Sequence, residues 1–138
     1  MLRGSMLAVA LAIFVTLAMT TSAQSFRLSA SIPFEFTVNG HTLPAGQYLL
    51  NKHPDFPNGW VIADVKHHSN SVLVALPAQA KQEGEQPRLV FHRYGSHYFL
   101  CELWTSTSDH VLAFKESREE RQLVQAIGRP DIQAVAMR

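Results

Sequence analysis

Residues 26–38 read FRLSASIPFEFTV, and this stretch decides the fold class. Apolar side chains occupy every second position from Phe26 to Val38, with charged, polar or proline residues between them. Successive side chains of a β-strand point to opposite faces, so this alternation predicts a strand with one buried face. Pro33 has no N–H to donate to a sheet. We therefore expect a sheet edge, a bulge or a break between two short strands at that position.

The chain beyond this stretch continues as short apolar segments separated by turn signals. Asn39-Gly40 favours a tight turn because both residues tolerate a positive φ, and Gly95-Ser96 has the length of a hairpin linker. Further strands are predicted at residues 47–51, 60–66, 71–76, 88–94, 97–105 and 111–114. Six to eight short strands joined by tight turns predict a mainly β fold, either a small antiparallel β-barrel or a β-sandwich.

The pattern changes after residue 116, where one amphipathic helix is predicted near the C-terminus. Ser117 and Glu120 have the spacing of a capping box, and Gly128 followed by Pro130 is a stop signal. The apolar positions between them recur at helical spacing, at Leu123, Val124 and Ile127. We predict a helix over 118–127, lying on the sheet or across an open end. Residues 118–121 are interpreted as its solvated face.

The first 23 residues have the features of a cleavable secretory signal. Arg3 precedes an apolar run from Met6 to Met19, and Thr21 and Ala23 occupy the −3 and −1 places before Gln24. An uncleaved anchor is the alternative, but a spanning helix needs about 20 apolar residues. We therefore predict export to the periplasm or the outside of the cell, with no membrane span after cleavage. The predicted organisation is a signal at 1–23, a single β domain at 24–128 and a tail at 129–138.

Composition restricts the function classes further. Removing 23 of the 138 residues leaves 115, which is the size of one domain, and Arg3 is the only charge removed. Eleven basic and eleven acidic residues remain, so the chain lacks the basic surface that nucleic-acid binding requires. The single cysteine, Cys101, has no partner for a disulfide within the chain. It follows the apolar run 98–100 and is interpreted as a buried small hydrophobe.

Seven histidines in a short chain raise the hypothesis of a metal site. His92 and His97 flank the Gly95-Ser96 turn and could approach each other across a hairpin. With His110 or Glu102 they would supply three ligands. Surface histidines explain the same count equally well. We find no catalytic motif and predict neither a cofactor nor an enzymatic activity.

A second group of residues could line a ligand cavity. Arg93, Tyr94, Tyr98 and Trp104 offer aromatic faces with a cation nearby, suited to an apolar or sugar-like ligand, although core packing explains aromatic residues equally well. On strict alternation Arg93 shares a face with the apolar side chains at 89 and 91. Either the strand is bulged or the guanidinium is buried and paired, with Glu102 or Glu35 as its partner.

Several of these segments resemble a family of small exported bacterial proteins of unknown function. The resemblance rests on IPFEFTVNG at 32–40, LPAGQY at 43–48, LVFHRYG at 89–95, YFL at 98–100, Trp104 and KESREER at 115–121. It covers most of the chain after residue 23 and implies export and one β domain, with no activity to transfer. Such proteins tend to have Pro-Lys-Ser-Arg where this chain has Glu116 before Ser117, so the start of the helix is expected to differ.

The sequence therefore predicts an exported, non-enzymatic β domain that binds a small ligand or a protein partner in the cell envelope or outside the cell. One alternative is a metal-binding protein or enzyme that uses His92, His97, Glu102 and His110. Another is a structural or assembly subunit, which would associate through an exposed strand edge.

Overall fold

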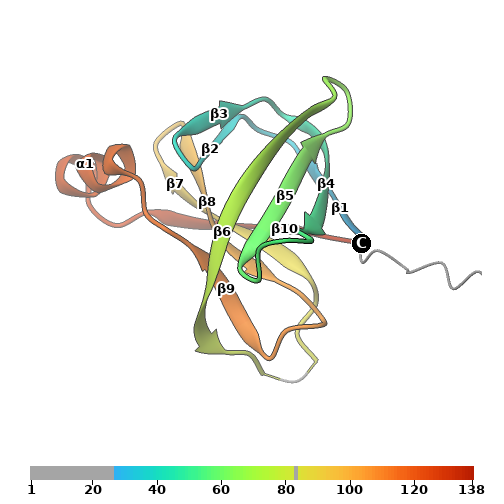
Figure 1. Ribbon diagram of the computed structural model, residues 1–138. Coiled ribbons are helices and arrows are strands. Elements are labelled where there is room, and N and C mark those ends of the chain that lie inside the picture. Colours follow the sequence, from blue (N-terminus) through green and yellow to red (C-terminus); the bar gives the residue numbers. More distant parts are fainter. Residues whose placement is uncertain (1–26, 83) are drawn as a thin grey trace, which may run out of the picture.

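The computed structural model describes residues 27–82 and 84–138, so the predicted signal peptide and its cleavage site lie outside the described residues. The described chain forms one mainly β domain with a short helix near the C-terminus (Figure 1). The elements are β1 (Arg27–Ile32), β2 (Phe36–Val38), β3 (His41–Leu43), β4 (Gly46–Lys52), β5 (Gly59–Asp64), β6 (Ser69–Ala80), β7 (Arg88–Tyr94), β8 (His97–Trp104), β9 (His110–Phe114), α1 (Arg118–Ile127) and β10 (Asp131–Ala136).

The strands form one mixed ten-stranded sheet. The main path runs β1-β4-β5-β6-β9-β8-β2-β3, and β7 lies off this path between β8 and β10. The long strand β6 belongs to both parts of the sheet, because residues 69–74 pair with β5 and residues 75–80 pair with β9. Neighbouring strands are antiparallel except at β2 and β8, which meet in parallel at Thr37 and Phe99.

The predicted class and helix are confirmed, but the β-barrel, one of the two predicted architectures, is wrong. The sheet is not closed into a barrel, and it is a single sheet rather than two separate ones. Only an isolated bridge between Ala30 and Met137, with two backbone hydrogen bonds between Ser29 and Arg138, joins the end of the chain to β1. Ten strands also exceed the six to eight expected. The short β3 and the largely exposed β10 carry no alternating pattern that sequence inspection could detect.

The local signals at the start of the domain behave as predicted. Pro33 lies in a break between β1 and β2, so the long alternating stretch is two short strands. The turn between β2 and β3 has a positive φ at both residues, 51° at Asn39 and 75° at Gly40. This turn returns β3 antiparallel to β2.

The core is one cluster to which both parts of the sheet contribute. The alternating side chains Leu28, Ala30 and Ile32 of β1 are buried in it, as the sequence pattern predicts. At its centre the ring of Phe36 makes edge contacts with Tyr48 and Phe91, at centroid distances of 5.3 and 5.4 Å. A shared core means that the curved sheet behaves as one packing unit.

The helix α1 begins and ends as the sequence predicts. The backbone N–H of Glu120 donates to Ser117 Oγ at 3.1 Å, and Gly128 ends the helix with a φ of 99°. The interpretation of residues 118–121 as a solvated face is wrong for Glu120, which is buried, whereas Val124 and Ile127 are exposed. Among the described residues, no helix is long and apolar enough to cross a membrane.

Candidate functional site

A β-bulge in β8 brings Cys101 to the face of the sheet on which α1 lies. In the pairing of β7 with β8, Val90 is opposite Glu102 and Phe91 is opposite Leu100, which leaves Cys101 unpaired. The extra residue lets Leu100 and Leu103, three positions apart, both enter the main core. Cys101 then lies on the other face, diagonal to His92, whose cross-strand partner is Phe99.

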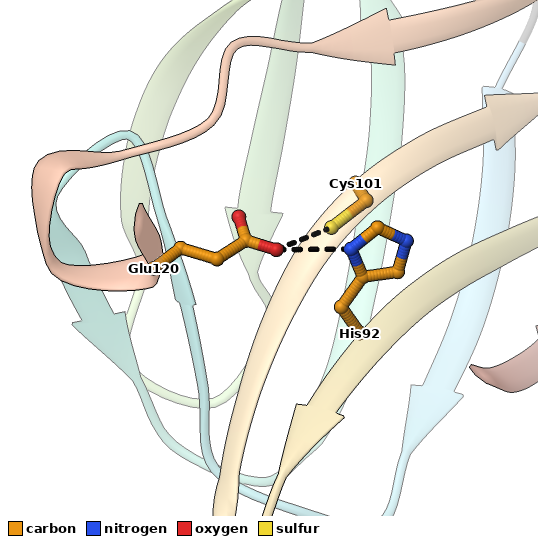
Figure 2. Close-up of side chains that lie close together, drawn as sticks. All are labelled: His92, Cys101 and Glu120. Carbon is orange, nitrogen blue, oxygen red and sulfur yellow. Dashed lines mark hydrogen bonds and ion pairs between the residues drawn. The ribbon is translucent and has the colours of Figure 1, made fainter. Parts of the chain in front are cut away.

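Three side chains on this face converge on the carboxylate of Glu120. Figure 2 shows Glu120 reaching from α1 toward His92 of β7 and Cys101 of β8. Its Oε1 atom accepts hydrogen bonds from His92 Nδ1 at 2.9 Å, Tyr94 Oη at 3.1 Å and Cys101 Sγ at 3.6 Å. Tyr94 and Glu120 are buried, whereas His92 and Cys101 are half-buried. The four residues are called the Glu120 cluster below.

Electrostatics of the Glu120 cluster favour an ionised carboxylate beside a protonated imidazole. Burial would raise the pKa of Glu120, but the hydrogen bonds from His92 and Tyr94 outweigh it and lower that pKa. The hydrogen bond to Glu120 raises the pKa of His92 against the opposing effect of burial. Burial and the negative charge of Glu120 raise the pKa values of the Tyr94 hydroxyl and the Cys101 thiol. Both groups therefore stay neutral at physiological pH. The Tyr94 hydroxyl donates to the carboxylate, and the single thiol hydrogen of Cys101 has two acceptors, Glu120 Oε1 at 3.6 Å and the carbonyl of Phe99 at 3.3 Å.

The Glu120 cluster has two chemical capacities. Three donors on one oxygen of a buried carboxylate replace the water that this oxygen loses, so Glu120 fixes the first turn of α1 to the sheet. The same groups also offer one nitrogen, one sulfur and one carboxylate oxygen, all within 4.8 Å of one another. In the part of the chain that the structure describes, His92, Cys101 and Glu120 are the only group of at least three His, Cys, Asp or Glu side chains with this geometry.

The predicted metal ligands are not brought together. His92 belongs to the Glu120 cluster, but His97 is exposed at the β7–β8 turn, and His110 is exposed at the start of β9 beside Ser108. Glu102 instead accepts a hydrogen bond from Trp104 Nε1 at 2.9 Å. Inspection of the sequence missed Cys101 and Glu120 because a capping box does not say where its acidic side chain points. The only sequence signal of the bulge is the spacing of Leu100 and Leu103. In a regular strand, two residues three positions apart point to opposite faces, yet both are apolar and both enter the core.

The predicted ligand-binding residues lie in three different environments. Tyr94 is buried beneath α1, and Tyr98 stacks on Phe34 at 3.8 Å between ring centroids. The ring of Trp104 lies 3.9 Å from the guanidinium carbon of Arg88. These three side chains do not converge on one cavity.

Arg93 is exposed, so the alternative of a buried guanidinium paired with Glu102 or Glu35 is wrong. Its Nε donates to the carbonyl of Gly95 at 2.8 Å, and the guanidinium lies 5.6 Å from the ring centroid of Tyr98. The end of β7 has reached the edge of the core at this residue. Arg93 still points to the same face of the sheet as Phe91, but this face is exposed to solvent at Arg93.

An apolar groove of about 470 Å³ lies on another part of the surface. It is bounded by the end of β2, by residues 73–78 of β6 and by the end of β9. Apart from Asn39 and Lys115, its lining residues are all apolar, and Val74 and Leu76 are 61% and 53% exposed. The groove exists because β9 ends at Phe114 while β6 continues along β5. None of the predicted ligand-binding residues lines it.

Comparison with known proteins adds no identification. No family model, curated protein or solved structure matches this chain. The resemblance to a family of exported bacterial proteins therefore stays a prediction.

Proposed function

We propose that this protein is an exported, non-enzymatic β domain that binds a small amphiphile, with an apolar body and an anionic head, in the groove between β2, β6 and β9. The observation that carries this proposal is an apolar groove of about 470 Å³ on the surface of a small domain. Ligand pockets are typically about 300–1,000 Å³ and mostly apolar, with a few polar groups that orient the ligand.

The apolar body of the ligand is inferred from the outer face of β6. Val72, Val74 and Leu76 alternate on this face and are all exposed, although most strands of this domain present polar residues to solvent. A ligand that covers the exposed apolar side chains of the groove removes them from water, and this burial lowers the free energy of the complex. Val74 and Leu76 line the groove, whereas Val72 lies just outside it.

The anionic head is inferred from charge at one end of the groove. Lys115 follows β9 and is exposed, and among the lining residues it is the only charged one. The amide of Asn39 also lines the groove, although its Nδ2 donates to the carbonyl of Val72 at 3.4 Å. A carboxylate head beside Lys115 would gain an exposed ion pair, whose contribution is about 0.2–1 kcal/mol.

The test is a calorimetric titration, in which a long-chain fatty acid is added to the chain that begins at residue 24. We expect saturable one-to-one binding, weakened several-fold by Lys115→Gln, and weakened to a similar extent when the methyl ester replaces the acid. Lys66→Gln, which removes a lysine outside the groove, is the matched control and should leave the affinity unchanged.

The groove itself is tested by a polar substitution on β6. Leu76→Asn removes apolar surface from the lining and is expected to weaken binding at least tenfold, since burying one such side chain contributes about 1.5–3 kcal/mol. Val72→Asn makes the same kind of change on the same face outside the groove and should bind as wild type. Absence of saturable binding, or equal effects of the two variants, would contradict the proposal.

Export is a separate part of the proposal and has its own test. The full chain is expressed in a bacterium with a general secretory pathway, and the protein recovered outside the cytoplasm is sequenced from its N-terminus. A start at Gln24 is expected from the small residues at Thr21 and Ala23. A start at Met1, or recovery from the cytoplasm alone, would show this part to be wrong.

A further inference from the structure

We infer that His92, Cys101 and Glu120 form a binding site for one divalent transition-metal ion of the zinc type, with an open fourth position. This inference is independent of the groove, because none of the three residues lines it. It rests on three observations, which are the distances among the ligand atoms, the chemistry of the donor set and the access from solvent.

The distances among the ligand atoms suit tetrahedral coordination. Bonds of about 2.0–2.3 Å to nitrogen, oxygen and sulfur place neighbouring ligands about 3.3–3.8 Å apart. Glu120 Oε1 lies 2.9 Å from His92 Nδ1 and 3.6 Å from Cys101 Sγ, and all three ligand atoms fall within 4.8 Å. Small side-chain rotations would therefore admit the ion.

The donor set selects the class of metal. Calcium and magnesium bind oxygen ligands in larger number, so one carboxylate does not form a site for them. A thiolate, an imidazole and a carboxylate together favour Zn²⁺, and Co²⁺ has the same ligand preferences. Three protein ligands leave one position for water or another small molecule, as in zinc sites whose fourth ligand exchanges.

The proton balance of binding follows from the hydrogen bonds that the ion would replace. Cys101 must lose its thiol proton to become a ligand, and His92 must free Nδ1 by carrying its proton on Nε2. Glu120 is already ionised. Binding of one ion therefore releases one proton when His92 starts neutral and two when it starts protonated. The resulting centre of one divalent ion, one thiolate and one carboxylate has no net charge.

The surroundings would support such a centre. Tyr94 donates to Glu120 at 3.1 Å and would orient the ligating carboxylate, as outer hydrogen-bond donors do in metal sites. The side chain of His92 is 30% exposed, so an ion can reach the site without unfolding of the domain. The competing interpretation is that the cluster only attaches α1 to the sheet, and the experiment separates the two.

In the experiment, Co²⁺ is added stepwise to the reduced, metal-free protein, and the absorption spectrum of the mixture is recorded after each addition. We expect one equivalent to produce a sulfur-to-cobalt charge-transfer band and the visible bands of tetrahedral Co²⁺, with displacement by Zn²⁺. Cys101→Ser should abolish the charge-transfer band, and His92→Ala should weaken binding at least tenfold. The matched controls are His97→Ala and His110→Ala, which remove exposed histidines outside the cluster and should bind as wild type.

Two further measurements keep the proposal open to refutation if a variant folds poorly. Tyr94→Phe keeps the three ligands and should weaken Co²⁺ binding about tenfold or more. The affinity of wild type should rise about tenfold per pH unit for each proton released, measured from pH 6 to pH 8. Absence of the charge-transfer band in folded wild type, or equal loss in the His97→Ala control, would overturn the proposal. Leu76→Asn should leave Co²⁺ binding unchanged, so this test and that of the groove fail separately.

Discussion

Glu120 is the residue at which the helix and the sheet of this protein are joined. Its backbone N–H is satisfied by Ser117, and its carboxylate accepts from His92, Tyr94 and Cys101 on two strands. An ionised group this deeply buried is stable only because several donors replace its water. The residue therefore contributes both to the stability of the domain and to any chemistry at its surface.

The ion pair between His92 and Glu120 predicts a particular pH dependence of stability. The pKa of Glu120 is lowered from 4.5, so its contribution is present above that value and is lost as the pH falls through the lower folded value. The pKa of His92 is raised from 6.5, so its contribution is present below that value and is lost as the pH rises through the higher folded value. The pair therefore stabilises the fold most between about pH 4.5 and 6.5.

His92→Gln tests this window. We expect the variant to lower the free energy of unfolding by about 1–3 kcal/mol within the window, and by less on either side of it, in urea denaturation at a series of pH values. His97→Gln is the control, because that histidine is exposed at the hairpin turn. A difference from wild type that does not vary with pH would contradict the assignment.

Gly59 is a residue at which even one methyl group should be destabilising. A Cβ atom at this position would lie 2.8 Å from Phe56 Cβ and 2.9 Å from His53 Cβ. Gly59→Ala is expected to lower the free energy of unfolding by about 1–3 kcal/mol, because the loop before β5 must move. Gly46→Ala is the matched control, since nothing lies within 4 Å of its added Cβ. That control should stay within about 1 kcal/mol of wild type, and equal effects of the two variants would refute the crowding.

At the scale of elements, α1 depends on its N-terminal cap more than on its apolar side chains. Val124 and Ile127 are exposed, and the helix is attached to the sheet chiefly through Glu120 in its first turn. A short helix with little apolar contact is marginal without capping. The cap therefore sets the position of Glu120 as well as the start of the helix.

Ser117→Ala is expected to lower the free energy of unfolding by about 1 kcal/mol, because the N–H of Glu120 loses its acceptor. Ser117→Asn supplies another acceptor and should recover most of that loss. Chemical denaturation measures both, and hydrogen exchange of the α1 amides reports whether the helix opens before the sheet. Equal stability of Ser117→Ala and wild type would show that the cap contributes nothing measurable.

At the scale of the whole molecule, β10 completes the sheet by covering an edge of β7. Each residue from Asp131 to Ala136 has a partner on β7, and the buried Met137 follows. A chain ending at Pro130 would leave that edge of β7 unpaired. We expect this chain to be less stable and to self-associate, as measured by sedimentation velocity against the full domain. A truncated monomer as stable as the full chain would contradict this role of β10.

The sequence was sufficient for the local elements, because their signals are local. Alternation predicted the buried face of β1, Pro33 predicted its end, and Ser117 with Gly128 predicted the bounds of α1. These features depend on backbone dihedral angles and on hydrogen bonds between near neighbours. They are therefore visible in a single sequence.

Features that depend on distant contacts could not be predicted in the same way. Alternation suggested a buried Arg93, but the face of β7 on which Arg93 lies is solvent-exposed at that position. The capping box suggested that the side chain of Glu120 lies on the solvent-exposed surface of the helix. Packing of α1 against β7 and β8 instead orients this side chain toward the sheet. The groove depends on where β9 ends relative to β6, which no sequence signal records.

The bridge between Ala30 and Met137 has a consequence for the order in which the chain is synthesised and folds. One edge of β1 pairs with β4, but its contact with Met137 cannot form until residues more than a hundred positions after Ala30 have been made. Synthesis is slow compared with the folding of small domains. The time at which this contact forms is therefore set by synthesis of the last residues. If the chain is exported as proposed, a secretory channel that accepts only unfolded polypeptide would meet it before this contact has formed. Under that proposal, folding would finish after translocation, once β10 and Met137 are available to pair.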